Sequence, residues 1–74
     1  MITDEQIAND PILTFFSFDH LREGPLKATS ALFAELAVQI ISILPRSAER
    51  TVALRKLLEA KDAGVRCALD LLKN

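Results

Sequence analysis

The stretch LPRSAERTVALRKLLEAKD, residues 44–62, holds a turn, a helix start and the first half of a long amphipathic helix. Pro45 predicts the end of a preceding helix, because the residue before a proline is pushed out of the α region. Ser47 is a good N-cap, since its hydroxyl can accept from a free N–H group of the first turn. Glu49 lies in that turn, where the helix dipole favours an anion. The stretch therefore predicts two helices joined by a short turn.

The same turn carries a pair of arginines at the start of the second helix. Arg46 and Arg50 place two guanidinium groups beside helix N–H groups that lack an intrahelical partner. This combination suits a phosphate or another anion. The alternative, in which the arginines are solvated or paired with a neighbour such as Glu49, stays open.

Length and composition narrow the protein class. With 74 residues the chain is one domain at most, and a core of this size often needs a disulfide, a metal or a partner subunit. Cys67 is the single cysteine, which excludes a disulfide within one chain, and His20 is the single histidine. No metal-ligand spacing is present. We therefore expect no metal and no cofactor, and expect oligomerisation or tight helix packing instead.

The charge and hydropathy of the chain predict its partners and its cellular compartment. A net charge of -1 is unlike a general DNA or RNA binder, which would show a strong basic excess. The hydrophobic fraction is 50%, yet we expect no run that matches the roughly 18 to 20 residues of a membrane span. The first residues lack the basic, apolar and small-residue regions of a signal peptide, so none is expected. These features predict a cytoplasmic protein with no membrane partner.

Two helices are expected to make up most of the fold. Residues 25–44 have helical periodicity, with Pro25 suited to the first helical position. Over residues 36–44 this helix is apolar nearly all round, so it must be buried nearly all round. One neighbouring helix covers one side, and we expect a second copy of the chain to cover the rest. The predicted inward face consists of Leu26, Phe33, Leu36, Ala37, Ile40, Ile41 and Leu44.

The second helix is expected over residues 48–72, with Asp62 and Arg66 as an i,i+4 ion pair. A row of small residues on it would let another helix approach closely. Before the helices, residues 12–18 are apolar and β-prone but have no second strand to pair with, which favours an extended arm. The predicted fold is thus all-α: an antiparallel helical hairpin (residues 24–74) with an N-terminal extended arm and loop (residues 1–23), assembling into a helical oligomer. The small-residue row consists of Ala53, Ala60, Gly64 and Ala68.

No catalytic constellation is recognisable, so the chain is not expected to be an enzyme. One histidine without a nearby nucleophile makes no triad, and Cys67 is interpreted as a small apolar filler of the core. His20 follows several phenylalanines, and rings together with an imidazole could stack on a nucleobase. The alternative is that the phenylalanines simply pack on the helices, which sequence alone favours.

Two motifs resemble a known family. FSFDHL, residues 16–21, resembles an arm motif of aromatic, any residue, aromatic, then His. LPRSAERTVAL, residues 44–54, resembles a Pro-x-Ser-x-Glu-Lys/Arg-Ser/Thr-x-Ala-Leu turn and helix start. Together they are similar to the small helical-hairpin domain of phage anti-CBASS and anti-Thoeris sponge proteins, over about residues 15 to 70.

This resemblance implies a phage- or prophage-encoded, non-enzymatic sponge in the bacterial host cytoplasm. Such proteins sequester cyclic di- or trinucleotides or cyclic ADP-ribose isomers and so block CBASS or Thoeris signalling. They assemble as oligomers, typically hexamers, with pockets between protomers. The alternative is a helical protein–protein interaction or assembly module with no small-molecule ligand. The candidate ligand-binding residues are Phe18, His20, Arg22, Lys27, Arg46, Ser47, Arg50 and Thr51.

Overall fold

The N-terminal part of the chain begins with a short capped helix. The computed structural model describes residues 2–73, so the first residue of the expected arm and the last residue of the expected hairpin lie outside it. Helix α1 spans Asp4–Asn9. The Gln6 N–H donates to Thr3 Oγ1 at 3.1 Å, and the Thr3 N–H donates to Gln6 Oε1 at 2.8 Å. This reciprocal pair is a capping box, which satisfies two N–H groups at the helix start.

The second N-terminal element is the 3₁₀ helix η1, Pro11–Phe16. The prediction of an extended arm over residues 12–18 is therefore wrong for most of that segment. A 3₁₀ helix has about three residues per turn, so positions three apart lie on one face. Leu13 and Phe16 are three apart, and both side chains are completely buried. A compact helical turn buries both side chains together, and this burial explains why the segment does not stay extended.

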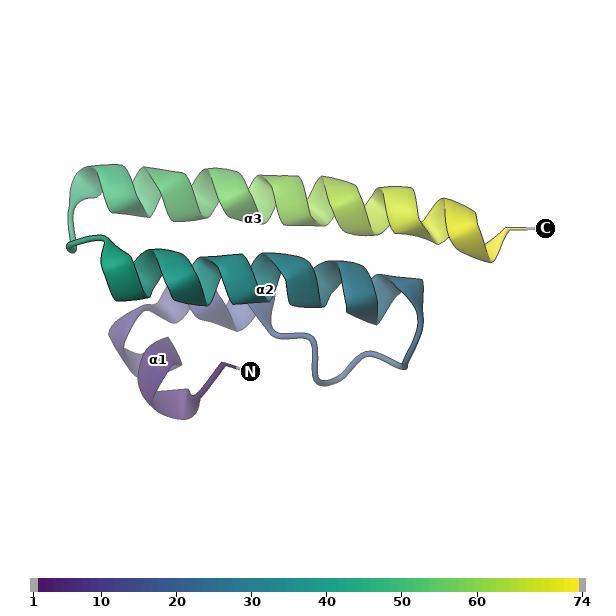
Figure 1. Cartoon of the computed structure of the whole chain (residues 1–74), viewed down its shortest axis with the longest axis horizontal. Coiled ribbons are helices and arrows are strands. Elements are labelled where there is room, and N and C mark those ends of the chain that lie inside the picture. The colour runs from purple at the N-terminus through teal and green to yellow at the C-terminus, as the bar shows by residue number, and fades with distance from the viewer. Residues whose placement is uncertain (1, 74) are drawn as a thin grey trace.

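Two long helices form the rest of the molecule. Helix α2 spans Pro25–Ile43 and helix α3 spans Ala48–Ala68, which continues into a 3₁₀ turn, η2, at Leu69–Leu72. Figure 1 shows α2 and α3 side by side, running in opposite directions. The Arg50 N–H donates to Ser47 Oγ at 3.1 Å, as expected for the N-cap. Every regular element among residues 2–73 is helical, so the prediction of an all-α chain is confirmed.

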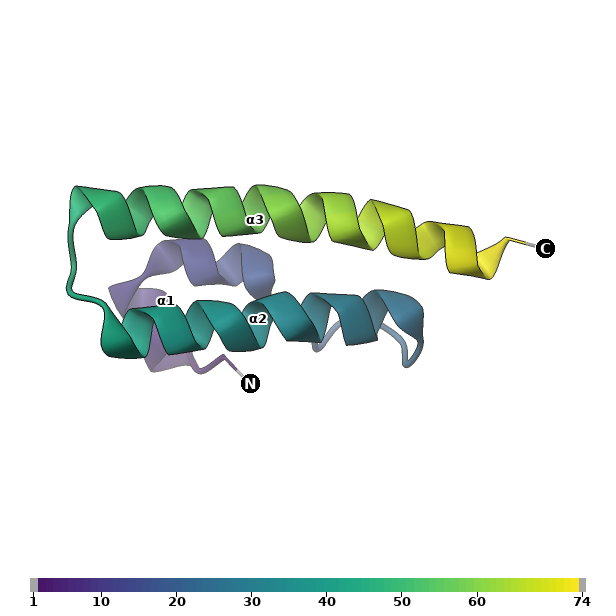
Figure 2. The ribbon, with the colours of Figure 1, turned by 45° about the horizontal axis from the view of Figure 1, so that its top comes forward.

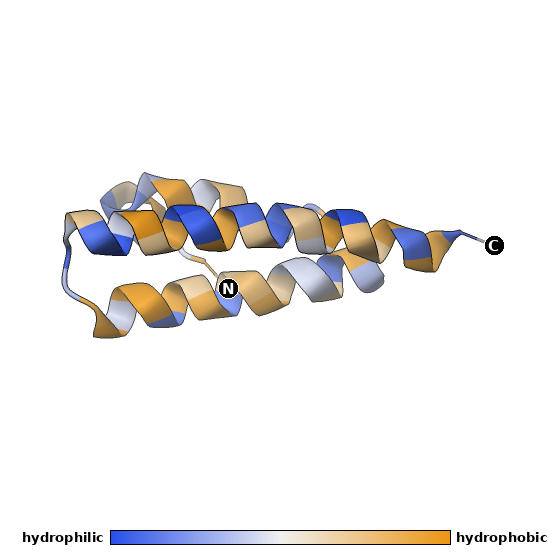
Figure 3. Ribbon diagram, turned by 90° about the horizontal axis from the view of Figure 1, so that it is seen from above, coloured by the Kyte–Doolittle hydropathy of each residue, from blue (hydrophilic) through white to orange (hydrophobic). Residues whose placement is uncertain are grey.

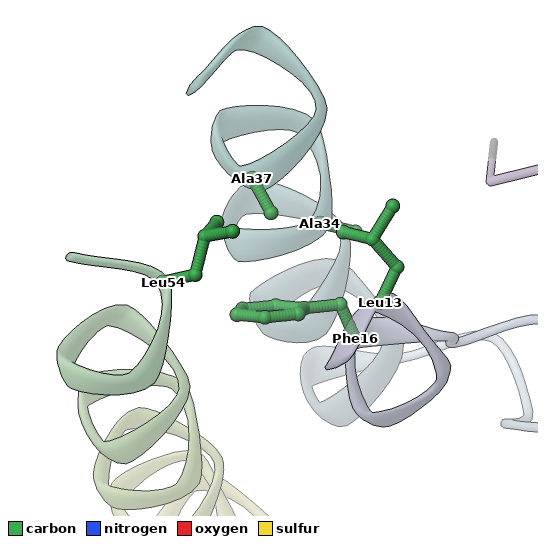
Figure 4. Close-up of a cluster of buried hydrophobic side chains, with 5 residues drawn as sticks. All are labelled: Leu13, Phe16, Ala34, Ala37 and Leu54. Atoms are coloured by element: carbon green, nitrogen blue, oxygen red, sulfur yellow. The ribbon is translucent and has the colours of Figure 1, made fainter. Parts of the chain in front are cut away.

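The core lies where η1 meets the two long helices. Figure 2 shows α1 and η1 on one side of the α2–α3 pair, and Figure 4 shows the ring of Phe16 extending from η1 between these helices. Helix α2 contributes two alanines to this core, and helix α3 contributes one leucine. The completely or almost completely buried cluster consists of Leu13, Phe16, Ala34, Ala37 and Leu54.

The inward face of α2 differs from the predicted one. Leu36 and Leu44 were expected to be buried, but both are exposed. The buried residues of α2 are small: Ser30, Ala34 and Ala37. Of the predicted face, Phe33, Ile40 and Ile41 are partly buried and pack against the core. The physical reason is that Leu13 and Phe16 of η1 fill the space beside α2, so the most deeply buried positions of α2 carry small side chains and its larger apolar residues are only partly buried.

The two long helices approach closely at Gly64. A Cβ atom placed on Gly64 would lie 3.1 Å from Phe33 Cε2 and 3.5 Å from Thr29 Cγ2, both on α2. This confirms the close approach predicted for the small-residue row at this position, where an alanine side chain would press on Phe33. Elsewhere in that row Ala68 is buried, whereas Ala53 and Ala60 are exposed.

Helix α2 leaves much apolar surface uncovered. Leu32 is 68% exposed and Ile43 is 75% exposed, and Figure 3 shows hydrophobic residues most densely along the C-terminal half of α2. By length and composition α2 could cross a membrane, contrary to the expectation from sequence. The scattered polar residues of its first turns lower the mean hydropathy too little to prevent this. The core helices of soluble proteins can be equally long and apolar.

Candidate functional site

The arginine pair at the start of α3 is held by a carboxylate from the N-terminal segment. The Arg50 side chain is 8% exposed and forms an ion pair with Asp10, whose side chain is 12% exposed. Arg50 Nη1 also donates to the carbonyl oxygen of Leu44 at 3.2 Å. Arg46 Nη1 lies 3.4 Å from Asp10 Oδ1, but the Arg46 side chain is 66% exposed. Arg50 thus joins the turn, α3 and the end of α1 rather than facing solvent.

A small hollow of 190 Å³ adjoins this ion-pair cluster and is lined in part by Arg46, Arg50 and Thr51. The polar groups around it are already engaged within the chain. The Thr51 hydroxyl donates to the Ser47 carbonyl at 3.2 Å, and the Ser47 hydroxyl caps the helix. Two cations share one carboxylate here, so a single positive charge remains, mostly on the exposed guanidinium of Arg46.

A larger hollow of 480 Å³ lies between the segment around η1 and the C-terminal half of α3; we call it the His20 cavity. Its wall combines hydroxyls, aromatic rings and charged groups from elements far apart in sequence. Ser30, which is 3% exposed, reaches it from α2. Of the candidate ligand-binding residues, only His20 borders this cavity. The cavity is lined by Thr14, Phe15, Ser17, His20, Leu21, Ser30, Lys61, Asp62, Val65 and Arg66.

The other candidate residues lie apart from both hollows. Phe18 lines a separate recess of 330 Å³ along α2. Arg22 borders a fourth recess, next to the C-terminal Leu72. Lys27 Nζ lies 3.0 Å from Glu23 Oε1, as an i,i+4 ion pair at the start of α2. Within one chain, the predicted residues therefore fall into several places and do not form a single pocket.

The sequence pattern did not indicate the charged residues of α3 that border the His20 cavity. It paired Asp62 with Arg66, but Asp62 Oδ1 instead lies 3.1 Å from Lys61 Nζ. Arg66 has no ion-pair partner among residues 2–73. It also missed Asp10, the partner of Arg50, which lies 40 residues away along the chain. The spacing of residues along one helix predicts neither the contact between α3 and the His20 segment nor the ion pair between Arg50 and Asp10.

Little in the described residues points to reaction chemistry. No group of three or more His, Cys, Asp or Glu side chains among residues 2–73 could hold a metal ion. Cys67 is exposed, so its interpretation as a core filler is wrong. Comparison with protein-family models, with curated proteins and with solved structures gave no match to this chain.

Proposed function

We propose that this protein is a non-enzymatic sponge that binds cyclic nucleotide messengers and withholds them from anti-phage signalling of the CBASS or Thoeris type. The observation that carries the proposal is the His20 cavity, in which aromatic, hydroxyl and cationic groups meet in 480 Å³. Small-molecule sites commonly occupy about 300–1,000 Å³. Aromatic rings can stack on bases, and cationic side chains bind phosphate. The messenger class, cyclic di- or trinucleotides or cyclic ADP-ribose isomers, comes from the motif resemblance.

The proposal includes assembly of the helical hairpin into an oligomer, such as a hexamer, in the cytoplasm of a bacterial host. Its support is the apolar side chains that one chain leaves exposed on α2, among them Leu32, Leu36 and Ile43. Soluble monomers rarely expose large contiguous apolar patches. A second copy would cover this surface better than lipid, because the charged helix α3 runs directly alongside α2 (Figure 3). No DNA, RNA or membrane partner is part of the proposal.

A thermal-shift panel tests the binding function. Cyclic dinucleotides, cyclic trinucleotides and cyclic ADP-ribose isomers are added separately, with the matching linear nucleotides as controls. At a hundred times the dissociation constant, a ligand should add about 2.7 kcal/mol to the free energy of unfolding. For a chain of this size that corresponds to roughly 10–20 °C in Tm. Bound messenger should return chemically intact after heat denaturation, and recovery of a cleaved product would show an enzyme.

The second candidate function is a helical assembly module without a small-molecule ligand. Its support is the Arg50 side chain, which is engaged by Asp10 and the Leu44 carbonyl rather than free for a phosphate. Both functions predict a mass above 8.2 kDa in light scattering. They differ in the thermal-shift panel, where the assembly module predicts no change in Tm with any cyclic nucleotide.

A further inference from the structure

We propose that Lys61 and Arg66 form the phosphate-binding wall of the His20 cavity, and that its ligand is a phosphate ester carrying a planar base. This inference deepens the proposed function and rests on it for the identity of the ester as a cyclic messenger. It assigns the phosphate to the C-terminal half of α3 rather than to the arginines at the start of that helix.

The helix geometry brings both cations to the cavity. Residues 61 and 65, and residues 62 and 66, are i,i+4 neighbours, so the four side chains form two adjacent rows on α3. All four border the cavity. Lys61 and Arg66 stand at opposite corners of this patch, about 7.5 Å apart along the helix axis at 1.5 Å per residue. They also lie roughly 140° apart around the axis at 3.6 residues per turn, but both border the cavity, so an extended phosphate ester bound there can contact both cations.

The charge of the wall is incompletely balanced within the chain. The Lys61 side chain is only 16% exposed, whereas its partner Asp62 is 51% exposed. Arg66 has no ion-pair partner among the residues from 2 to 73. Two cations therefore face one carboxylate. Lys61 is partly buried and attracts an anion more strongly than a solvated cation does, because the surrounding dielectric constant is lower, whereas Arg66 is exposed. A phosphate group supplies the missing negative charge.

The opposite side of the cavity suits a base and a sugar. Phe15 is 62% exposed at the rim although its neighbour Phe16 is completely buried. An exposed ring on an anchored element is a stacking surface that accepts any base. Thr14, Ser17 and Ser30 border the same space, and a hydroxyl group can both donate and accept hydrogen bonds. His20 adds a second ring with polar nitrogens.

The hollow at the start of α3 is the weaker phosphate site. Both of its arginines already contact Asp10, so a ligand phosphate would have to displace that carboxylate. Displacement would also leave Asp10 without its cations in a largely buried position. This hollow has a volume of 190 Å³, against 480 Å³ for the His20 cavity.

Calorimetry and amide NMR titration of the full-length protein test the assignment. The probes are cyclic di-AMP, cyclic tri-AMP, AMP and pyrophosphate. We expect Lys61→Gln and Arg66→Gln each to weaken binding about tenfold or more, because each removes a charged hydrogen bond. Arg66→Lys should retain part of the affinity. Arg55→Gln, an exposed substitution on the same helix, is the matched control and should bind as the wild type does. Circular dichroism verifies that every variant stays helical.

The possible outcomes separate the two proposals. If AMP or pyrophosphate shifts the cavity amides and needs Arg66, but no cyclic nucleotide binds, the phosphate wall stands and the messenger function fails. If a cyclic nucleotide binds and only Arg46→Gln weakens it, the messenger function stands and the assignment to Lys61 and Arg66 is overturned. If no probe shifts an amide of the cavity at millimolar concentration, the phosphate wall is overturned; if cyclic ADP-ribose isomers added in the same titration also shift no amide, the messenger function is overturned with it.

Discussion

Replacement of Phe16 by alanine is the sharpest test of the fold, because it asks whether the N-terminal segment is core or arm. Phe16 is 0% exposed and lies between η1, α2 and α3 (Figure 4). A fully buried phenylalanine removes about 150–250 Å² from water, which at ~25 cal/mol per Å² corresponds to roughly 4–6 kcal/mol. Measured core Phe→Ala losses are about 3–5 kcal/mol, and we expect Phe16→Ala to fall in that range.

This loss is large compared with the stability of so small a chain. At about 0.05–0.15 kcal/mol per residue, a chain of this length has a free energy of unfolding of roughly 4–11 kcal/mol. Phe16→Ala should therefore lower Tm by more than about 12 °C, at 4–8 °C per kcal/mol, or unfold the protein. Urea titration followed by circular dichroism measures the change. Wild type and variant must be compared at one protein concentration, because assembly makes stability depend on concentration.

The neighbouring residue provides a matched control. Phe15 is 62% exposed, so Phe15→Ala should change the free energy of unfolding by about 0.5 kcal/mol or less. The same chemical deletion at adjacent positions should thus give effects that differ severalfold. Equal small losses for the two variants would refute the reasoning, because they would show that residues 11–16 do not pack on the helices.

Three further predictions follow from other contacts. Asp10→Ala should lower the free energy of unfolding by about 3 kcal/mol or more in urea titration, because it leaves Arg50 buried without its carboxylate; a loss below about 1 kcal/mol would show that the pair contributes little. Gly64→Leu should destabilise by about 1–3 kcal/mol despite its better helix propensity, because its side chain would press on Phe33; a higher Tm would contradict the close approach. Ile43→Glu should reduce the mass measured by light scattering while the helical signal is retained, since this side chain is 75% exposed in one chain; an unchanged mass would exclude it from the interface.

The bounds of the long helices could be predicted because local chemistry sets them. The helix expected at 25–44 is observed at Pro25–Ile43, and the one expected at 48–72 is observed as Ala48–Ala68 followed by Leu69–Leu72. Proline restricts the backbone of the residue before it, and the hydroxyl of Ser47 satisfies an N–H three residues later. Both effects act within one turn, so neighbouring residues suffice to predict them.

The candidate site was less predictable because its partners are distant in sequence. Arg50 was recognised as a special residue, but its partner Asp10 is 40 positions away. His20 was singled out, yet the cations beside it come from α3, more than forty positions further along the chain. Spacing along a helix predicted the pair Asp62–Arg66, whereas the structure pairs Asp62 with Lys61. Where a charged side chain has two possible ion-pair partners, the surrounding tertiary structure determines which pair forms.

The sequence by itself determined that the chain is all-α, where its two long helices begin and end, and that one helix carries more apolar surface than one neighbour can bury. The tertiary structure alone decided that η1 folds into the core, that the most deeply buried residues of α2 are its small ones, and that His20 shares a cavity with Lys61 and Arg66. The physical reason is the range of the interactions. Capping and turn geometry act between neighbours, whereas burial and ion pairing depend on which distant segments meet.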